Sequence, residues 1–160
     1  QGEVLHERSQ VPIAHQGSPM RLQRPIVLRL PIAPSMNHYW RSVIAGSGTQ
    51  LHAKVLLSRE GRRYREQAGL EVLRQWPAEV PKPLTGRIRL KIGVFPADKR
   101  SFDIDNRIKS LMDLLQIAGV CENDSQVDDL HIMRCATIGA PGYMIVCISV
   151  IPRTGDEVAQ

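Results

Sequence analysis

A strict two-residue alternation near the middle of the chain is the feature that most constrains its fold. Apolar residues occupy every second position from Ile88 to Val94, and the positions around them hold Arg87, Arg89, Lys91 and Gly93. Successive side chains of a strand point to opposite faces, so a period of two marks a strand. The segment is therefore predicted to be a half-buried strand with a basic outer edge.

Two helices are predicted, one before and one after this strand in the sequence. The first runs from an N-cap at Ser58 to Trp76, carries an apolar face, and is ended by Pro77. The second fits residues 106–117, which place apolar side chains on one side, with Gly119 as its C-terminal stop.

Further extended segments complete the predicted fold. A strand is expected over residues 26–30, and a turn at 35–41 leads into a second extended piece, followed by a mobile loop at 46–48. Two more strands are expected over about 130–136 and 143–151. The order β-β-α-β-α-β-β predicts an α/β (α+β) single domain with a mixed β-sheet and two main helices.

Length and composition fit one soluble domain. With 160 residues, the chain is predicted to contain a leader that is flexible or a cloning remnant (1–24), the domain itself (25–152) and a C-terminal tail (153–160). Three cysteines without metal or redox spacing indicate a reducing compartment. Because no apolar run reaches the roughly 20 residues of a membrane span and no signal peptide is evident, a cytoplasmic location without membrane contact is expected.

The balance of charge indicates which partners to consider. A net charge of +5 and a pI near 9.4 favour a polyanionic partner, although many basic proteins bind neither nucleic acid nor membrane. Only two Trp, three Tyr and two Phe are present, so a stacking platform for single-stranded bases is poorly supplied.

Acidic residues form two clusters within this basic chain. Asp103 and Asp105 lie two residues apart, so they point the same way in an extended segment, and Lys109 follows on the same helical face as Asp105. The run from Glu122 to Asp129 holds four acids and no base. Facing carboxylates repel one another, and a divalent ion such as Mg²⁺ removes that repulsion with few protein ligands. The pattern indicates metal-assisted hydrolysis of a nucleic-acid backbone, with Lys109 offsetting transition-state charge.

Simpler interpretations of the same residues stay open. An Asp-x-Asp before a helix, taken alone, is more often a cap and a solvated turn. Lys109 then pairs with Asp105 or with Asp113, a structural residue on its helical face. Asp128 and Asp129 are the polar start of a strand in this view, and only Asp124 of the second cluster is a candidate ligand.

Several motifs occur together in one order. They are Pro34-Ser35-Met36-Asn37-His38-Tyr39-Trp40-Arg41, Ser58-x-Glu60-Gly61-x-x-Tyr64-Arg65, Asp103-x-Asp105-Asn106-x-x-Lys109 with Asp113, and Asn123-Asp124-Ser125-Gln126-Val127. On these motifs the chain, from Ile26 to about Val150, resembles the RusA family of Holliday-junction resolvases, small endonucleases of bacteria and their phages. The leader and the segment 44–54 are longer than in the family's compact form.

The resemblance implies a function and a set of site residues. Asp103, Asp105 and Asp124 match the family's metal-binding aspartates, and Lys109 matches its essential lysine. The family acts as a homodimer that binds four-way DNA junctions and nicks two strands symmetrically with Mg²⁺ or Mn²⁺, in DNA recombination and repair. Candidate contacts to DNA are Asn37, Arg41, Arg87, Arg89, Lys91, Lys99 and Arg100.

Two other functions remain compatible with the sequence. One is a metal-dependent nuclease for flaps, linear duplex or RNA, and the other is a non-catalytic basic DNA-binding protein whose acidic cluster is structural. The sequence specifies neither the number of metal ions nor the preferred cutting sequence. It also leaves two candidate dimer surfaces, namely the first helix with Trp76 and the last strands.

Overall fold

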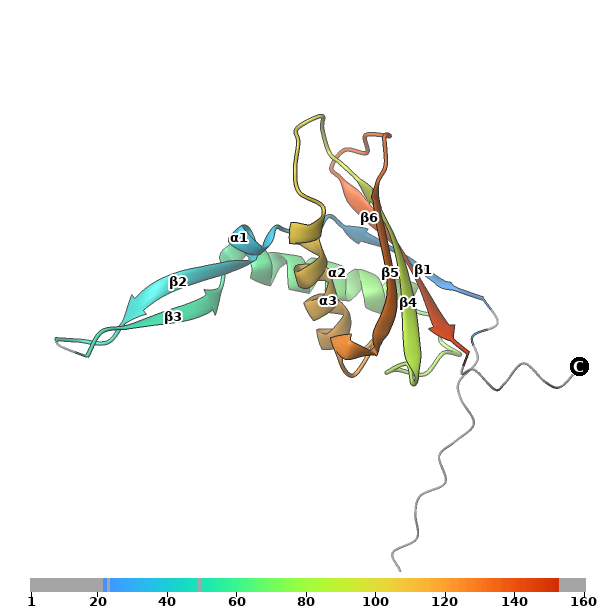
Figure 1. Cartoon of the computed structure of the whole chain (residues 1–160), viewed down its shortest axis with the longest axis horizontal. Coiled ribbons are helices and arrows are strands. Elements are labelled where there is room, and N and C mark those ends of the chain that lie inside the picture. The colour runs from blue at the N-terminus through green and yellow to red at the C-terminus, as the bar shows by residue number, and fades with distance from the viewer. Residues whose placement is uncertain (1–21, 23, 49, 153–160) are drawn as a thin grey trace, which may run out of the picture.

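A computed structural model describes residues 22, 24–48 and 50–152 (Figure 1). Within these residues it has six strands, three α-helices and two short 3-10 turns. In chain order the elements are β1 (Ile26–Pro31), α1 (Met36–Tyr39), β2 (Trp40–Ala45), β3 (His52–Leu57), α2 (Arg59–Gln75), β4 (Arg87–Phe95), η1 (Asp105–Arg107), α3 (Ile108–Ile117), η2 (Asp124–Gln126), β5 (Val127–Arg134) and β6 (Tyr143–Ile151). The mixed α+β single domain with two main helices is thereby confirmed.

The main sheet has four strands in the order β1-β6-β4-β5. Strand β6 lies antiparallel to both β1 and β4, whereas β4 and β5 are parallel. A parallel pair needs a crossover connection, and α3 lies within that connection. The sheet is therefore mixed, as predicted from the sequence.

The hydrophobic core lies between the sheet and its two long helices, which cover the same face (Figure 1). The apolar positions of β4 from Ile88 to Val94 are at most 1% exposed, so the predicted alternation corresponds to a buried face and an outer face. Leu111, Leu114 and Leu115 of α3 pack into this core, and Tyr64, Ala68 and Val72 do so from α2. Among the described residues no helix covers the outer face.

Both helices begin and end near the predicted residues. The hydroxyl of Ser58 accepts a hydrogen bond from the Gly61 amide at 2.9 Å, which confirms the N-cap of α2. Gly119 follows α3 with a φ of +70°, a conformation that glycine adopts without strain. The second helix differs in one respect, because it starts with the 3-10 turn η1 at Asp105.

The predicted element order is wrong at one place. The sequence predicts one extended piece followed by a mobile loop and no further strand before the first helix. Instead, β2 and β3 pair as an antiparallel hairpin that forms a separate two-stranded sheet and projects from the body (Figure 1). A weak alternation could have revealed β3, because Leu51, Ala53 and Val55 alternate with His52 and Lys54.

The ends of the chain are not tested by the structure. Apart from Leu22 and Arg24, the predicted leader lies outside the described residues, and so does the tail 153–160. The domain boundaries therefore stay predictions. Among the described residues, no helix has the length and apolar character that crossing a bilayer would require.

Because β4 lies in the middle of the sheet, substitutions in it test which of its faces is buried. Leu90 is 1% exposed and lies between Ile148 of β6 and Leu130 of β5. Leu90→Ala should lower the free energy of unfolding by about 2–5 kcal/mol, measured by urea denaturation, because it leaves a cavity in the core. Lys91→Ala, on the outer face, should change it by only about 0.5 kcal/mol or less. Equal losses for the two variants would contradict the assignment of faces.

Candidate active site

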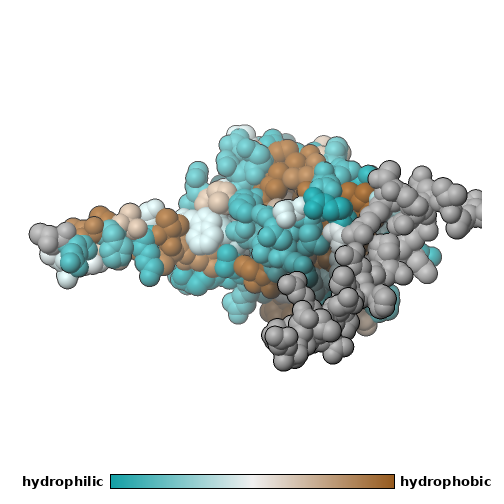
Figure 2. Space-filling model, turned by 60° about the horizontal axis from the view of Figure 1, so that its bottom comes forward, coloured by the Kyte–Doolittle hydropathy of each residue, from teal (hydrophilic) through white to brown (hydrophobic). Residues whose placement is uncertain are grey.

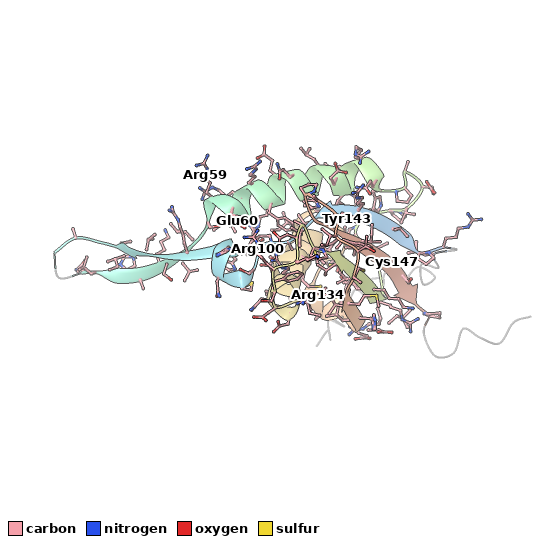
Figure 3. The ribbon with its side chains drawn as sticks, turned by 90° about the horizontal axis from the view of Figure 1, so that it is seen from above. Arg59, Glu60, Arg100, Arg134, Tyr143 and Cys147 are labelled. Carbon is pink, nitrogen blue, oxygen red and sulfur yellow. The ribbon has the colours of Figure 1, made fainter. Side chains whose placement is uncertain are left out.

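The acidic segment before α3 is held in place by an aromatic residue that the sequence analysis missed. Phe102 directly precedes Asp103, and its ring contacts the guanidinium groups of both Arg107 and Arg134, each 4.5 Å from the ring centroid. Arg134, labelled in Figure 3, also donates a hydrogen bond to the Phe102 carbonyl. Two cation–π contacts restrain the ring. This clamp of two arginines therefore ties the segment to both β5 and η1.

Asp103 and Asp105 sit at the start of the α3 region with exposed side chains. A carboxylate oxygen of Asp103 accepts a long hydrogen bond, 3.4 Å, from the side-chain amide of Asn106. Asp105 is the first residue of η1, and its carbonyl accepts the backbone amide of Ile108. The two predicted ligands are thus close in sequence, exposed, and bound to little else.

Asp124 is the first residue of the hydrogen-bonded turn η2, which follows α3 in the chain. Asn123 and Gln126 form a reciprocal capping box around η2. The side-chain amide of Gln126 also donates to the carbonyls of Leu84 and Gly86, both at 3.0 Å. The turn that carries Asp124 is therefore tied to the chain segment leading into β4.

Lys109 connects the two acidic motifs. Its Nζ lies 2.9 Å from a carboxylate oxygen of Asp124, 15 residues away, and 3.3 Å from one of Asp113. The hydrogen bonds to Asp124 and then to Asp113 raise the pKa of the Lys109 ammonium. The same hydrogen bond, together with the positive charge of Lys109, lowers the pKa of Asp124. The pairing of Lys109 with Asp113, foreseen in the sequence, is confirmed.

Three aspartates offer the ligands of a divalent-ion site, but they come from segments at opposite ends of α3 in the chain. Asp103, Asp105 and Asp124 offer exposed or half-exposed carboxylate oxygens, which are the hard ligands that Mg²⁺ prefers. Within the described ranges, no three Asp, Glu, His or Cys side chains converge closely enough to enclose an ion. Since Mg²⁺ usually keeps several waters, one or two carboxylates suffice to bind it. The three-aspartate site stays a prediction.

The segment that precedes the hairpin lies against the same helix. The hydroxyl of Ser110 donates to the Pro34 carbonyl at 2.7 Å, and Arg107 donates to the carbonyl of Ala33. Tyr39, buried at the end of α1, accepts a 2.6 Å hydrogen bond from Arg65. Burial raises the pKa of the Tyr39 phenol, with Arg65, Asp113 and Lys109 acting on it more weakly. The segment from Ala33 to Tyr39 is therefore a neighbour of the lysine and its carboxylates.

Some predicted phosphate contacts already have carboxylate partners. Arg87 is paired with Asp128, and Arg89 with Asp129 at 2.5 Å, so these two arginines are largely neutralised on the outer face of the sheet. Arg100 is paired with Asp98 at 2.6 Å. Asp128 and Asp129, which the sequence left as bystanders, have this pairing role because they lie in β5 opposite β4.

The other candidate contacts lie on the surface without such partners. Lys91, Lys99, Asn37 and Arg41 are exposed, and in the described part of the chain none of the three cations forms an ion pair. Contact of any of the seven predicted residues with DNA stays a prediction.

The shared lysine can be tested without any substrate. Lys109→Met removes both the hydrogen bond and the positive charge that favour the ionised carboxylate, so the pKa of Asp124 should rise toward the ordinary Asp value of about 3.9. Carboxyl carbon-13 shifts followed by NMR through an acid titration in EDTA measure it. Asp98, whose pKa is lowered by Arg100 instead, serves as the internal control and should not move. An unchanged Asp124 would show that Lys109 does not contact it in solution.

Known proteins resemble this chain over most of its length. The family model described as Endodeoxyribonuclease RusA matches residues 30–146. The crossover junction endodeoxyribonuclease rusA of Enterobacteria phage HK97 is 34% identical over 105 residues, which cover 66% of this chain and 78% of the phage protein. The crossover junction endodeoxyribonuclease RusA of Aquifex aeolicus is 34% identical over 58 residues, 36% of this chain and 46% of that protein. On the matching family model and the phage relative, the chain belongs to the RusA family of endodeoxyribonucleases.

Proposed function

We propose that this protein is a metal-dependent endodeoxyribonuclease that resolves four-way DNA junctions by paired symmetric nicks, in DNA recombination and repair in the bacterial cytoplasm. The observation that carries the proposal is the contact between Lys109 and Asp124. It joins the two acidic motifs of a family whose relatives are named as crossover junction endodeoxyribonucleases. The contact therefore places the lysine of one motif against a carboxylate of the other.

Each residue of the site has a proposed role. Asp103, Asp105 and Asp124 would hold Mg²⁺ or Mn²⁺, which supplies polarisation of the scissile phosphate and a more acidic attacking water. The water oxygen would form a bond to phosphorus as the bond to the leaving deoxyribose oxygen breaks, the water would lose its proton to solvent, and the leaving oxygen would take one up. Lys109 stabilises the negative charge that gathers on the phosphate, and the Phe102 clamp keeps Asp103 in place.

We also propose that the protein works as a homodimer that docks through the outer face of the sheet. Antiparallel strands with one solvated face normally turn polar side chains outward. Here the outward residues of β6 include Tyr143, Ile145 and Cys147 as well as the polar Ser149, and Phe95 stacks on Tyr143 with ring centroids 4.6 Å apart. Such an apolar face favours a protein contact.

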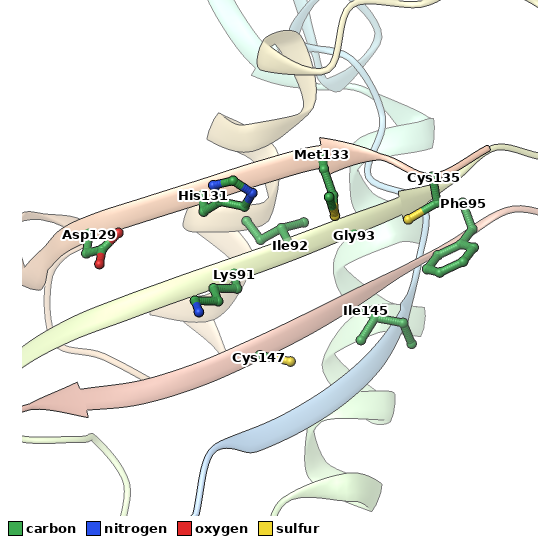
Figure 4. A pocket seen from close by; sticks show the side chains of 10 residues that line it. All are labelled: Lys91, Ile92, Gly93, Phe95, Asp129, His131, Met133, Cys135, Ile145 and Cys147. Carbon is green, nitrogen blue, oxygen red and sulfur yellow. The ribbon is translucent and has the colours of Figure 1, made fainter. Parts of the chain in front are cut away.

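The shape and charge of this face suit a second copy of the chain. A shallow hollow lies over β4, β5 and β6, and Figure 4 shows apolar side chains such as Ile145 and Met133 lining it. Lys91 and Asp129 stand on the same face, so the surface carries charges of both signs, which a two-fold contact can pair with each other. Trp76, the other candidate from the sequence, is instead partly buried against the core and donates to the Val80 carbonyl at 2.8 Å.

Cleavage of a synthetic four-way junction tests the catalytic proposal. Asp105→Asn should abolish cleavage in Mg²⁺ while junction affinity stays equal or rises, because the change removes a negative ligand and a repulsive charge. Asp98→Asn is the matched control, since Asp98 is paired with Arg100 and has no proposed role. Undiminished cleavage by Asp105→Asn would remove the mechanism.

The same assay separates the other two functions. Wild-type rates on a junction, a flap and a linear duplex should differ in favour of the junction. A preference for the duplex or flap would make the protein a nuclease of another specificity. Binding to all three without any cleavage would make it a non-catalytic DNA-binding protein.

Sedimentation velocity tests the dimer and its surface. Ile145→Glu places a charge in the apolar hollow and should convert a dimer to monomers. Leu73→Glu on the exposed side of α2, where Leu73 is 64% exposed, should leave the dimer intact. The reverse pattern would place the interface on α2, and a monomeric wild type would exclude the homodimer. Unchanged circular dichroism confirms that both variants are folded.

A further inference from the structure

The projecting hairpin has two chemically different faces. Pairing of Trp40 with Leu57, Ser42 with Val55 and Ile44 with Ala53 places these residues on one side. The pairs Arg41 with Leu56, Val43 with Lys54 and Ala45 with His52 lie on the other side. Side chains alternate along each strand, so one face is apolar and the other carries every basic residue of the two strands. In Figure 2 hydrophobic residues gather along the upper edge of the hairpin.

The base of the hairpin is fixed to the body. The Ser58 amide donates to the Tyr39 carbonyl at 2.9 Å, and the Ser58 hydroxyl donates to the carbonyl of His38. Gly61 leaves room for this closure, since a Cβ atom there would lie 2.6 Å from the Tyr39 carbonyl oxygen. The direction of the hairpin is therefore set by the first turn of α2, which starts with Arg59 (Figure 3).

The hairpin starts next to the catalytic block. Tyr39 immediately precedes β2, and the charges of both Lys109 and Asp113 act on its phenol. Six-residue strands extend about 20 Å, which equals the rise of roughly six base pairs of duplex DNA. A DNA backbone that presents a phosphate to Lys109 thus has the hairpin within reach along the adjoining helical arm.

The cations of the hairpin differ from those on the main sheet. Arg87 and Arg89 are each paired with an aspartate, whereas Arg41 and Lys54 are exposed and form no ion pair among the described residues. Unpaired cations on one face complement a row of phosphates, and binding releases the counterions held by DNA. The apolar face has no comparable feature that identifies a partner.

We infer that the β2–β3 hairpin is a DNA-binding arm whose face with Arg41, His52 and Lys54 contacts the phosphodiester backbone of a junction arm beyond the cleavage site. The inference rests on the proposed function and extends it, because it assigns a substrate contact to a segment outside the catalytic block. Since backbone contacts position DNA without reading its bases, the arm adds affinity and orientation rather than sequence preference.

Salt-dependent binding to a four-way junction, measured by fluorescence anisotropy in EDTA, tests the arm. Each phosphate contact adds about 0.9 to the slope of log affinity against log salt. Arg41→Gln/Lys54→Gln should therefore flatten the slope by about 1.8. If variant and wild type bind equally at 1 M salt, the variant should bind about 60-fold more weakly than wild type at 0.1 M salt. Arg24→Gln/Lys82→Gln removes two cations that form no ion pair among the described residues, near the start of β1 and just after the end of α2, away from the hairpin (Figure 1), and should leave the slope unchanged.

A variant of the opposite face completes the test. Ile44→Thr/Val55→Thr changes the exposed apolar side while both residues stay strand-compatible, and it should bind with the wild-type slope. If this variant alone alters the sedimentation coefficient or the affinity, while the basic-face variant binds like wild type, the arm docks on protein and the inference is wrong. Equal losses for the basic-face pair and the distant control would also overturn it.

Failure of the arm and failure of the proposed function give different results. Wild-type cleavage of the junction in Mg²⁺ reports the function, whereas the slopes in EDTA report the arm. A wild type that binds the junction but never cuts it would refute the proposed function. The DNA-binding role of the arm would then still be tested by comparing the salt slopes of wild type and the basic-face variant. A wild type that cuts, together with an unchanged slope for the basic-face variant, would refute the arm alone.

Discussion

The parallel pairing of β4 with β5 determines where the site can be. Parallel neighbours cannot be joined by a tight turn, so the chain must cross back over the sheet, and it does so through α3. The segments at either end of the crossover carry the two acidic motifs. A lysine in the first turn of α3 then reaches the carboxylate that follows the helix, because both lie on the covered side of one sheet. Topology, rather than closeness in sequence, brings these charges together.

Much of the fold followed from periodicity and helix signals. The alternation around Leu90 and the cap at Ser58 predicted β4 and α2 to within a residue or two, because burial and capping act locally. The second strand of the hairpin, β3, was missed because it buries little of its apolar face in the core, and a loop and a marginal strand then look alike in sequence. The contact of Phe102 with two arginines was equally hidden, because Arg134 is brought there by strand pairing.

The candidate site was only partly accessible from sequence. Spacing predicted that Lys109 shares a helical face with Asp113, and the structure bears this out. Its contact with Asp124 depends on the crossover and on the turn tied down by Gln126, neither of which a spacing rule contains. The basic residues of β4 show the converse, since Arg87 and Arg89 look like free cations in sequence but face aspartates on the adjacent strand.

The pleat of β4 divides substitutions into two independent classes. Inward side chains of β4 belong to the core on which α3 packs. A change there therefore alters both the stability of the fold and the position of the charged groups around α3. Outward positions contribute to neither, so their side chains can change without disturbing the core or the charged groups around α3, provided that the strand is kept. Relatives of this chain can therefore differ in what binds to the outer face while the charged groups around α3 keep the same arrangement.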